Sequence, residues 1–229
     1  MTEILMFDIR ELADTNLYHK VCEELPDVGL WKERSKKMSA YRFQEDRLRC
    51  IGGTLLIKYI FEAFGTDYGS LNISPYGKYI VEQSGFNFNI SHSGDYVVIA
   101  FGDTSCGIDI EQITDAGKIA GKFFCKSEAE QCTDPESFTR LWTLKEAYIK
   151  EVGEGLRIPL DSFEVVPGRI LHIGEELTAV TASPLTRVRN DEERQFSEFR
   201  LKLYCISVCS KSEISSRIER ISLNKLLNS

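Results

Sequence analysis

Two stretches of the sequence present predicted elements in the same order, and this order limits the fold more than any other feature. The stretches begin with strands at Ile4–Ile9 and Gly107–Glu111, continue through helices and end in groups of strands. The similarity lies in the order of elements and not in an identity repeat of fixed period. It suggests a duplicated domain.

The helices are predicted from apolar spacing and from their end signals. Apolar residues recur at helical intervals over Glu45–Phe64, and a second helical stretch, Lys118–Cys132, has a break near Lys126. Asp134-Pro135 is typical of an N-cap followed by proline in the first turn, and Gly153 is typical of a helix end. We therefore expect a helix that begins after Asp134 and ends at about Val152.

Alternating polarity predicts a hairpin at the end of the first half. Phe86, Phe88 and Ile90 alternate with polar residues, Ser91–Asp95 has the composition of a turn, and Tyr96–Phe101 is the returning strand. In the second half, further strands are expected at 162–166, 170–173, 177–181 and 199–209, with an exposed loop at 184–197.

Charge and cysteine content narrow the class of protein. The 229 residues can bury a sizeable core without disulfides, and a net charge of −7 is unfavourable for nucleic-acid binding. Seven cysteines without a C-x-x-C pair indicate reduced thiols in the cytoplasm. The acidic start predicts no signal peptide, and the longest apolar run, Tyr96–Phe101, is too short for a membrane span.

Asp109 and Glu111 are the first candidate functional residues. They stand two apart on a predicted strand, so both carboxylates lie on one face while Ile108 and Ile110 point into the core. Neighbouring carboxylates repel each other unless a cation or a proton lies between them, and Mg²⁺ prefers oxygen ligands of this kind. The alternative is an ordinary strand with one solvated face.

Glu146 and Lys150 are candidates on the helix that ends at Val152. Glu146 borders the apolar stripe that contains Trp142, where partial desolvation raises the pKa of a carboxyl group. Together with Asp109 and Glu111 it would complete an acidic triad. The alternative is a Glu146–Lys150 surface pair at i,i+4.

A basic stretch stands out in this acidic chain. Such a patch suggests a small polyanionic ligand, with a solvated helix face as the alternative. Lys78, and His92 in the predicted turn, are further candidates for phosphate contacts. Residues 32–49 hold seven basic residues, Lys32, Arg34, Lys36, Lys37, Arg42, Arg47 and Arg49, against the acidic residues Glu33, Glu45 and Asp46.

Five short motifs, in order from about residue 30 to about residue 165, resemble those of the 4′-phosphopantetheinyl transferases. The paired signature is Gly107-Ile-Asp-Ile-Glu111 and Trp142-Thr-Leu-Lys-Glu-Ala-Tyr-Ile-Lys150. Tyr76-Gly-Lys78 and Asn89-Ile-Ser-His-Ser93 are similar to upstream motifs of the larger, surfactin-synthetase-activating (Sfp-like) class, and Lys122-Phe-Phe-Cys-Lys-Ser-Glu128 is similar to the stretch between the two signatures. The chain departs from the family at Tyr79, where proline commonly follows the Gly-Lys pair.

The resemblance implies an α+β fold with pseudo-twofold duplication of two similar halves, expected at residues 1–104 and 105–229. It implies a monomer with coenzyme A in the cleft between the halves. The implied reaction transfers 4′-phosphopantetheine from coenzyme A to a serine of an apo acyl or peptidyl carrier protein and releases adenosine 3′,5′-bisphosphate.

The resemblance also implies a role for each candidate. Asp109, Glu111 and Glu146 would hold Mg²⁺, Glu146 would also activate the serine, and Lys150 would steady the phosphates. His92 is the alternative base. The set expected to bind coenzyme A is Arg34, Lys37 (or its neighbour Lys36), Arg49, Lys78, Ser91, His92 and Lys150.

Two other functions are compatible with the same residues. One is a Mg²⁺-dependent phosphohydrolase that acts on a nucleotide, and the other is a non-catalytic module that binds carrier proteins. The retained carboxylates, together with Lys150 and His92, argue against the second.

Overall fold

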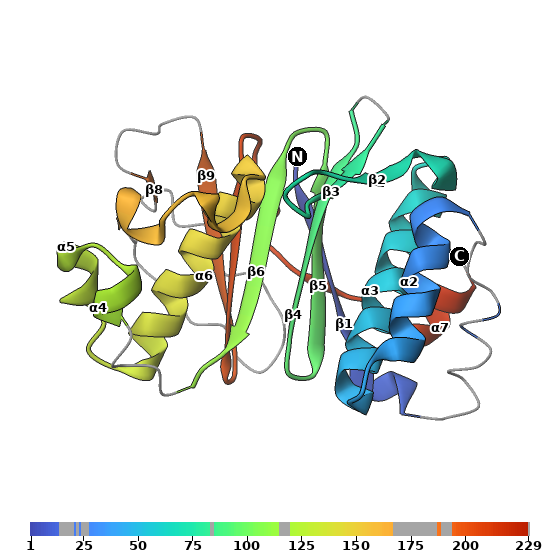
Figure 1. The fold of residues 1–229 in the computed structure, drawn as a ribbon, viewed down its shortest axis with the longest axis horizontal. Helices are drawn as coiled ribbons and strands as arrows, with labels where there is room; N and C mark the ends of the chain where they lie inside the picture. The colour runs from blue at the N-terminus through green and yellow to red at the C-terminus, as the bar shows by residue number, and fades with distance from the viewer. Residues whose placement is uncertain are drawn as a thin grey trace.

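A computed structural model describes residues 1–13, 21, 23, 28–82, 85–114, 120–166, 187–188 and 194–228. These residues form four layers, in which two β-sheets lie side by side and helices cover the outer face of each sheet (Figure 1). Alternation along β1 (Glu3–Asp8) explains the layering. Leu5 and Phe7 pack toward the helices, whereas Ile4 and Met6 pack toward the other sheet.

The first half carries the sheet with strand order β11-β1-β5-β4. The helices α2 (Gly29–Ala40) and α3 (Gln44–Ala63) cover it, and α3 packs directly on its strands. The remaining elements of this half are η1 (Ile9–Leu12), η2 (Tyr68–Ser70), β2 (Leu71–Ile73), β3 (Tyr79–Val81), β4 (Asn87–Ser93) and β5 (Tyr96–Gly102).

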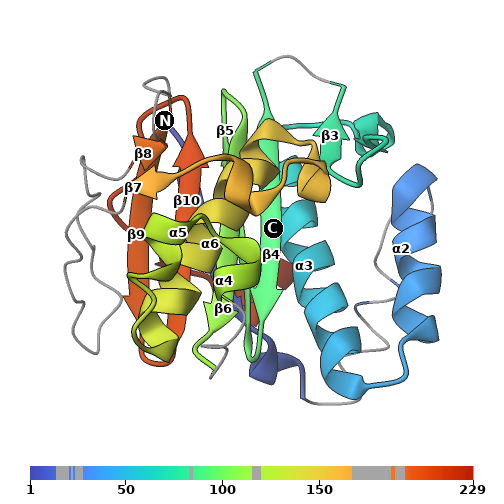
Figure 2. The ribbon, with the colours of Figure 1, turned by 60° about the vertical axis from the view of Figure 1, so that its left-hand side comes forward.

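The second half carries the sheet with strand order β6-β10-β9. Figure 2 shows α4, α5 and α6 together on the outer side of this sheet. The elements are β6 (Cys106–Gln112), α4 (Ala120–Phe123), α5 (Lys126–Ala129), α6 (Pro135–Val152), η3 (Gly155–Arg157), η4 (Leu160–Ser162), β7 (Val165–Val166), β8 (Arg187–Val188), β9 (Gln195–Leu201) and β10 (Tyr204–Ser210).

The two halves share one topology. In the first half, β5 lies between β1 and β4 and is antiparallel to both; in the second, β10 lies between β6 and β9 in the same way. A long helix, α3 or α6, follows the first strand, and a short antiparallel pair, β2-β3 or β7-β8, precedes the last two strands. The predicted α+β fold with pseudo-twofold duplication is therefore confirmed.

Local chemistry fixes the ends of α6 as predicted. The Asp134 side chain accepts a hydrogen bond from the Ser137 backbone N–H at 2.8 Å, and Pro135 occupies the first turn. Gly153 ends the helix with φ of 86°, in the left-handed region that favours glycine.

Gly107 allows β6 to lie directly against α6. A Cβ atom at this position would overlap the carbonyl oxygen of Ala147 and the backbone nitrogen of Glu151. This close approach brings Asp109, two residues further along β6, within reach of Lys150 on α6.

Polar side chains join the two halves along β4 and β6. Asn89 Oδ1 accepts a hydrogen bond from Ile108 N at 2.9 Å, Ser91 Oγ from Ile110 N at 3.4 Å, and Ser93 Oγ from Gln112 N at 3.0 Å. These alternate residues lie on one face of β4 and take the place of a backbone ladder. We call this row of three hydrogen bonds the seam.

Several sequence-based expectations differ from the structure. The strand expected at 162–166 is limited to β7, because Ser162 still belongs to η4. Ser91–Ser93 continue β4, and only Gly94 and Asp95 form the turn, because the seam keeps the strand extended. The strand expected at 199–209 is two strands, β9 and β10, which are separated where Lys202 adopts a positive φ of 46°. The loop expected at 184–197 contains β8 and the start of β9 in its described part, whereas the strands expected at 170–173 and 177–181 lie outside the described residues.

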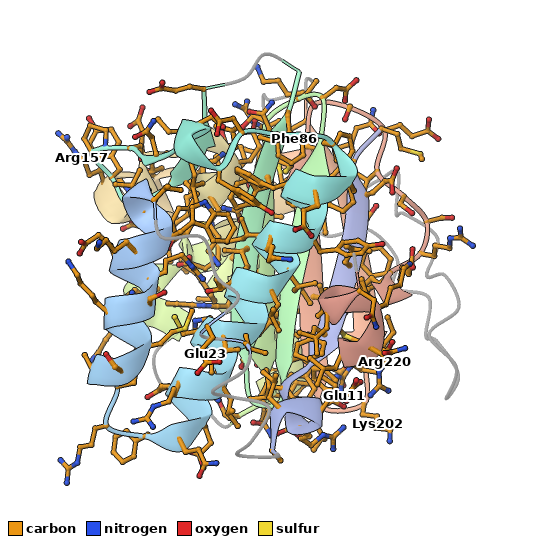
Figure 3. All side chains as sticks on the ribbon, turned by 90° about the vertical axis from the view of Figure 1, so that its right-hand side faces the viewer. Glu11, Glu23, Phe86, Arg157, Lys202 and Arg220 are labelled. Carbon is orange, nitrogen blue, oxygen red and sulfur yellow. The ribbon has the colours of Figure 1, made fainter. Side chains whose placement is uncertain are left out.

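The C-terminal segment, which the prediction of 105–229 assigned to the second half, contacts the first half. β11 (Glu219–Arg220) pairs in parallel with β1, and α7 (Leu223–Leu227) packs on α3. Glu11 and Arg220 lie on this side of the molecule (Figure 3). Glu11 accepts a hydrogen bond from the Leu223 N–H at 2.8 Å, which holds the start of α7.

Among the described helices, none combines the length and the apolar character that crossing a membrane requires.

Candidate active site

A cleft of about 680 Å³ opens where the two halves meet. Both β4 and β6, which run side by side between α3 and α6 (Figure 1), contribute residues to its lining. The first half contributes three cations, and the second contributes three carboxylates together with the cation of Lys150, which pairs with Asp109. The predicted residues that line the cleft are Arg34, Lys37, Arg49, Ser91, His92, Asp109, Glu111, Glu146 and Lys150.

Asp109 is the most buried acid in the cleft, with 2% of its surface exposed. Its Oδ1 accepts hydrogen bonds from Ser91 Oγ at 2.8 Å and from Lys150 Nζ at 2.5 Å. Its Oδ2 is buried without a hydrogen-bond partner among the described residues. A buried carboxylate oxygen without a partner is costly, so it has a strong tendency to take up a cation or a proton donor.

Lys150 pairs with Asp109, not with its helical neighbour Glu146, in the described structure. Its ammonium group also donates to Ser91 Oγ at 3.1 Å and to the Ile108 carbonyl at 3.3 Å. Ser91 therefore accepts from the seam and from Lys150 while it donates to Asp109. The alternative prediction, an isolated surface pair of Glu146 and Lys150, therefore does not describe the contacts of Lys150 among the described residues.

Glu111 and Glu146 complete the acidic wall. Burial and the neighbouring charge of Asp109 raise the pKa of Glu111, although the hydrogen bond from Ser93 Oγ, at 2.9 Å, opposes this rise. Burial raises the pKa of Glu146 to about 6; the charge of Lys150 opposes this rise, and the charges of Asp109 and Glu111 add to it. The expected rise at Glu146 is confirmed, because its position beside Trp142 removes part of its water.

The acidic wall has the donor chemistry of a Mg²⁺ site but is not a preformed cluster. Three carboxylates reach the same cleft, one of them has an unpartnered oxygen, and two have raised pKa values that a nearby cation would lower. Within the part of the chain that the structure describes, no three His, Cys, Asp or Glu side chains converge closely enough to count as a metal site.

The basic wall contains three cations that are held in different ways. Arg34 is 9% exposed and donates to Thr54 Oγ1 at 2.9 Å. Arg49 donates to the Gly94 carbonyl at 2.9 Å and pairs with Asp46 at 2.6 Å. Lys37 is exposed at the rim, 5.8 Å from the centroid of the Tyr41 ring.

The structure separates Lys36 from Lys37. Lys36 pairs with Glu33 at 2.8 Å and is absent from the cleft lining, whereas Lys37 is part of it. His92 lies on β4 at the cleft, not in a turn. Partial desolvation and the charges of Arg49 and Lys150 lower its pKa, so its imidazole is neutral near pH 7.

Lys78 lies outside the main cleft and binds backbone instead. Its ammonium group donates to the carbonyl oxygens of Cys106 at 3.3 Å and Glu151 at 2.9 Å, and to Ser105 Oγ at 3.1 Å. It thereby ties the β2-β3 turn to the second half. It lines a smaller pocket of about 260 Å³, which shares Gly77, Tyr79, Ile90, Glu146 and Lys150 with the main cleft.

Sequence reasoning missed a buried ion pair that joins α6 to α5. Lys145 and Glu128 are 0% and 1% exposed and pair at 2.8 Å, and Lys145 also donates to the carbonyl oxygens of Leu160 and Phe163 at 2.7 and 2.6 Å. The signal was present, since both residues stand in the quoted motifs. The pair anchors the helix turn that presents Glu146 to the cleft.

Comparison with known proteins gives the class of this fold and site. The family model described as "4′-phosphopantetheinyl transferase superfamily" matches residues 105–209, and the model described as "4′-phosphopantetheinyl transferase, N-terminal" matches residues 28–104. Individual relatives agree with the family models. The 4′-phosphopantetheinyl transferase gsp of Aneurinibacillus migulanus is 33% identical over 173 residues, which is 71% of this chain and 70% of the relative.

Two more relatives carry the same activity in their names. The 4′-phosphopantetheinyl transferase Sfp of Bacillus subtilis (strain 168) is 35% identical over 58% of this chain and 64% of its own length. The L-aminoadipate-semialdehyde dehydrogenase-phosphopantetheinyl transferase of Mus musculus is 30% identical over 58% of this chain and 51% of its own length. The match thus spans about two thirds of the bacterial relatives and about half of the mouse relative. The chain belongs to the 4′-phosphopantetheinyl transferase superfamily, within its Sfp-like class.

Proposed function

We propose that this chain transfers 4′-phosphopantetheine from coenzyme A to a serine of an apo acyl or peptidyl carrier protein. The observation that carries the proposal is the division of the cleft into a basic wall and an acidic wall. Coenzyme A carries a 3′-phosphate, which Lys and Arg side chains bind, and a pyrophosphate, which carboxylates bind through a divalent cation.

Arg34, Lys37 and Arg49 would bind the 3′-phosphate, and Lys150 and His92 would contact the pyrophosphate. Charge-assisted hydrogen bonds of this kind fix the orientation of a phosphate as well as its affinity. Ser91 would act through Lys150 and Asp109, since its hydroxyl is already hydrogen-bonded to both. Lys78 lines the smaller pocket, and it would reach a phosphate there by exchanging its contacts with the backbone carbonyls for the ligand.

Mg²⁺ is the metal that we propose for the acidic wall. Asp109, Glu111 and Glu146 would hold it, and small adjustments of their side chains would bring them together around it. When bound, the ion would neutralise charge on the pyrophosphate.

Glu146 is the residue that we propose as general base. The carrier serine Oγ would form a bond to the β-phosphorus of coenzyme A, the bond from that phosphorus to the adenosine 3′,5′-bisphosphate oxygen would break, and Glu146 would take the serine proton directly or through water. His92, which is neutral near pH 7, is the alternative base. Its neighbours Arg49 and Lys150 make a role in phosphate contact the better match.

The cleft, the cysteines and the net charge support our proposals about assembly, location and partners. One chain supplies both the basic and the acidic wall, so the proposed reaction needs no second copy, and we propose a monomer. Cys50, Cys106, Cys125, Cys132 and Cys205 are thiols, in agreement with a cytoplasmic protein whose partners are coenzyme A and a carrier protein. The net charge of −7 makes nucleic acid an unfavourable partner.

The test is the intact mass of apo carriers after incubation with coenzyme A and Mg²⁺. A panel of fatty-acid, polyketide and nonribosomal-peptide carriers should include at least one that gains a phosphopantetheinyl group, with release of adenosine 3′,5′-bisphosphate. A phosphohydrolase would cleave coenzyme A without any carrier, and a non-catalytic module would bind a carrier without changing its mass. Either result would refute the proposed transfer.

A further inference from the structure

Tyr79, at the position where the family commonly has proline, stands between the core and the basic wall of the cleft. It is the first residue of β3 and lines both the main cleft and the smaller pocket. Its ring is stacked on Phe88 of β4, with centroids 6.1 Å apart and an interplanar angle of 16°. Because Phe88 is buried in the core of the first half, the ring of Tyr79 is anchored from that side.

The cleft side of Tyr79 holds Arg34. The guanidinium carbon of Arg34 lies 5.2 Å from the ring centroid, and Nη1 of Arg34 donates a hydrogen bond to the Tyr79 hydroxyl. Thr54 Oγ1 and the carbonyl of Cys50 accept the other hydrogen bonds. A ring contact and three hydrogen bonds therefore define the orientation of this guanidinium.

The partners of Arg34 are uncharged, and this points to an anion as its ligand. Among the described residues, the group is 9% exposed and forms no ion pair with a carboxylate, unlike Arg49, which pairs with Asp46. A buried cation without a counter-ion is unfavourable unless a ligand supplies the negative charge. Gly53 lets the guanidinium and Ile90 lie close to α3, since a Cβ atom there would lie 3.4 Å from Nη2 of Arg34 and 3.0 Å from Cδ1 of Ile90.

We propose that Tyr79 is a positioning residue for the 3′-phosphate of coenzyme A, which it serves by holding the Arg34 guanidinium in its binding orientation. This rests on the proposed function. Tyr79 would thus contribute to the discrimination between coenzyme A and dephospho-coenzyme A, which lacks that phosphate. It would have little effect on the phosphoryl-transfer step at the opposite wall.

The test is the affinity of the full chain for coenzyme A and for dephospho-coenzyme A, measured by calorimetry without a carrier. Tyr79→Phe keeps the stacked ring and removes the hydroxyl. We expect the affinity for coenzyme A to fall about tenfold, because a hydrogen bond to a charged group is lost, and the affinity for dephospho-coenzyme A to change less than about twofold. In steady-state transfer, KM for coenzyme A should rise and kcat should stay the same.

Tyr96→Phe is the matched control. Tyr96 also lies beside an arginine, with Arg10 5.8 Å from its ring centroid and 3.4 Å from its hydroxyl, but it is absent from the cleft lining. Tyr96→Phe removes a hydroxyl from an Arg–Tyr pair outside the cleft, so the affinities for coenzyme A and for dephospho-coenzyme A should both stay unchanged. An equal loss at both ligands in Tyr79→Phe, or no loss at either, would overturn the proposal.

A double-mutant cycle with Arg34→Gln tests the route of the effect. If Tyr79 acts through Arg34, then Tyr79→Phe should change the affinity of the Arg34→Gln variant less than about twofold, whereas additive losses would contradict the proposal. The failure of the proposed function has a different signature. In that case the unmodified chain itself would not prefer coenzyme A over dephospho-coenzyme A and would not modify any carrier.

Discussion

The two halves have the same strand order and the same placement of a long helix, yet they supply different charges to the cleft, because all three carboxylates come from the second half, where Lys150 pairs with one of them. The first half contributes Arg34 and Lys37 from α2 and Arg49 from α3, and the second contributes Asp109 and Glu111 from β6 and Glu146 from α6. Duplication therefore provides two similar frameworks, and the side chains at their junction provide the chemistry. A ligand with two separate phosphate groups fits this division.

The helices also differ in how they meet their sheets. α6 lies close to β6 because Gly107 has no side chain, whereas α3 offers Gly53 to Arg34 and Ile90. In both cases the missing side chain allows a close approach, which is made by backbone atoms at Gly107 and by the side chains of Ile90 and Arg34 at Gly53. The acidic wall therefore stands on a strand and a helix whose backbones are in direct contact, whereas the basic wall is built from the longer side chains of Arg34, Lys37 and Arg49.

Among the substitutions at the cleft, Asp109→Ala in the second half should have the largest effect on the transfer rate. It removes the partner of Lys150 and the oxygen that we propose for Mg²⁺, so the transfer rate should fall about 10⁴-fold, the equivalent of several kcal/mol of charge stabilisation. Circular dichroism should report an unchanged fold. Asp103→Ala, which removes an exposed acid that pairs only with the N-terminus at 3.3 Å, should retain the full rate. An Asp109→Ala rate near that of the control would exclude a metal role for Asp109.

Glu146→Gln should lower kcat about 10²- to 10³-fold, because a general base is lost. The raised pKa of about 6 predicts an acid limb, since the carboxylate becomes protonated and inactive as the pH falls through that value. A bound cation would move the limb to lower pH. The pH dependence of kcat at saturating Mg²⁺ checks this, with exposed Glu130→Gln as the control.

The outcome separates the two roles of Glu146. An amide oxygen can still coordinate a metal but cannot accept the serine proton. If excess Mg²⁺ restores most of the Glu146→Gln rate and the acid limb persists, Glu146 is a metal ligand only.

Lys37→Ala and Lys36→Ala compare two neighbours on α2. Lys37 lines the cleft, so its loss should raise KM for coenzyme A about tenfold with little change in kcat. Lys36 pairs with Glu33 on the outer face, and its loss should leave KM within about twofold. Equal effects of the two substitutions would show that the patch acts through its overall charge and not through defined contacts.

The sequence predicted the acidic wall better than the basic wall. Asp109 and Glu111 are fixed by the two-residue period of a strand, and Glu146 by the caps of α6 at Asp134 and Gly153, so local rules were sufficient. Arg34 and Lys37 stand on α2, where polar and apolar residues separate only weakly between the two faces of the helix. Local rules therefore do not fix which of its side chains reach the cleft.

The remaining differences come from contacts between distant segments. The seam depends on Asn89 and Ser93 meeting β6 about nineteen residues later, and the resulting hydrogen bonds keep a turn-like composition extended. The return of β11 to β1 across more than two hundred residues has no local signal. Neither contact follows from propensity or from the spacing of apolar residues.

The smallest expected effects concern the seam that joins the two halves, and they should appear in stability before activity. Asn89 is 9% exposed and Ile108 is fully buried, so Asn89→Ala leaves the Ile108 N–H without a partner and should lower the free energy of unfolding by about 1–3 kcal/mol. Ser93→Ala exposes the Gln112 N–H to water at the open end of the seam, so its cost should stay below about 1 kcal/mol. Urea unfolding of both variants measures the difference. A contribution from the seam depends on how deeply each N–H is buried, so it should differ between the two positions. Equal costs at the two positions would therefore mean that the halves are held by their shared apolar core and not by this row of hydrogen bonds.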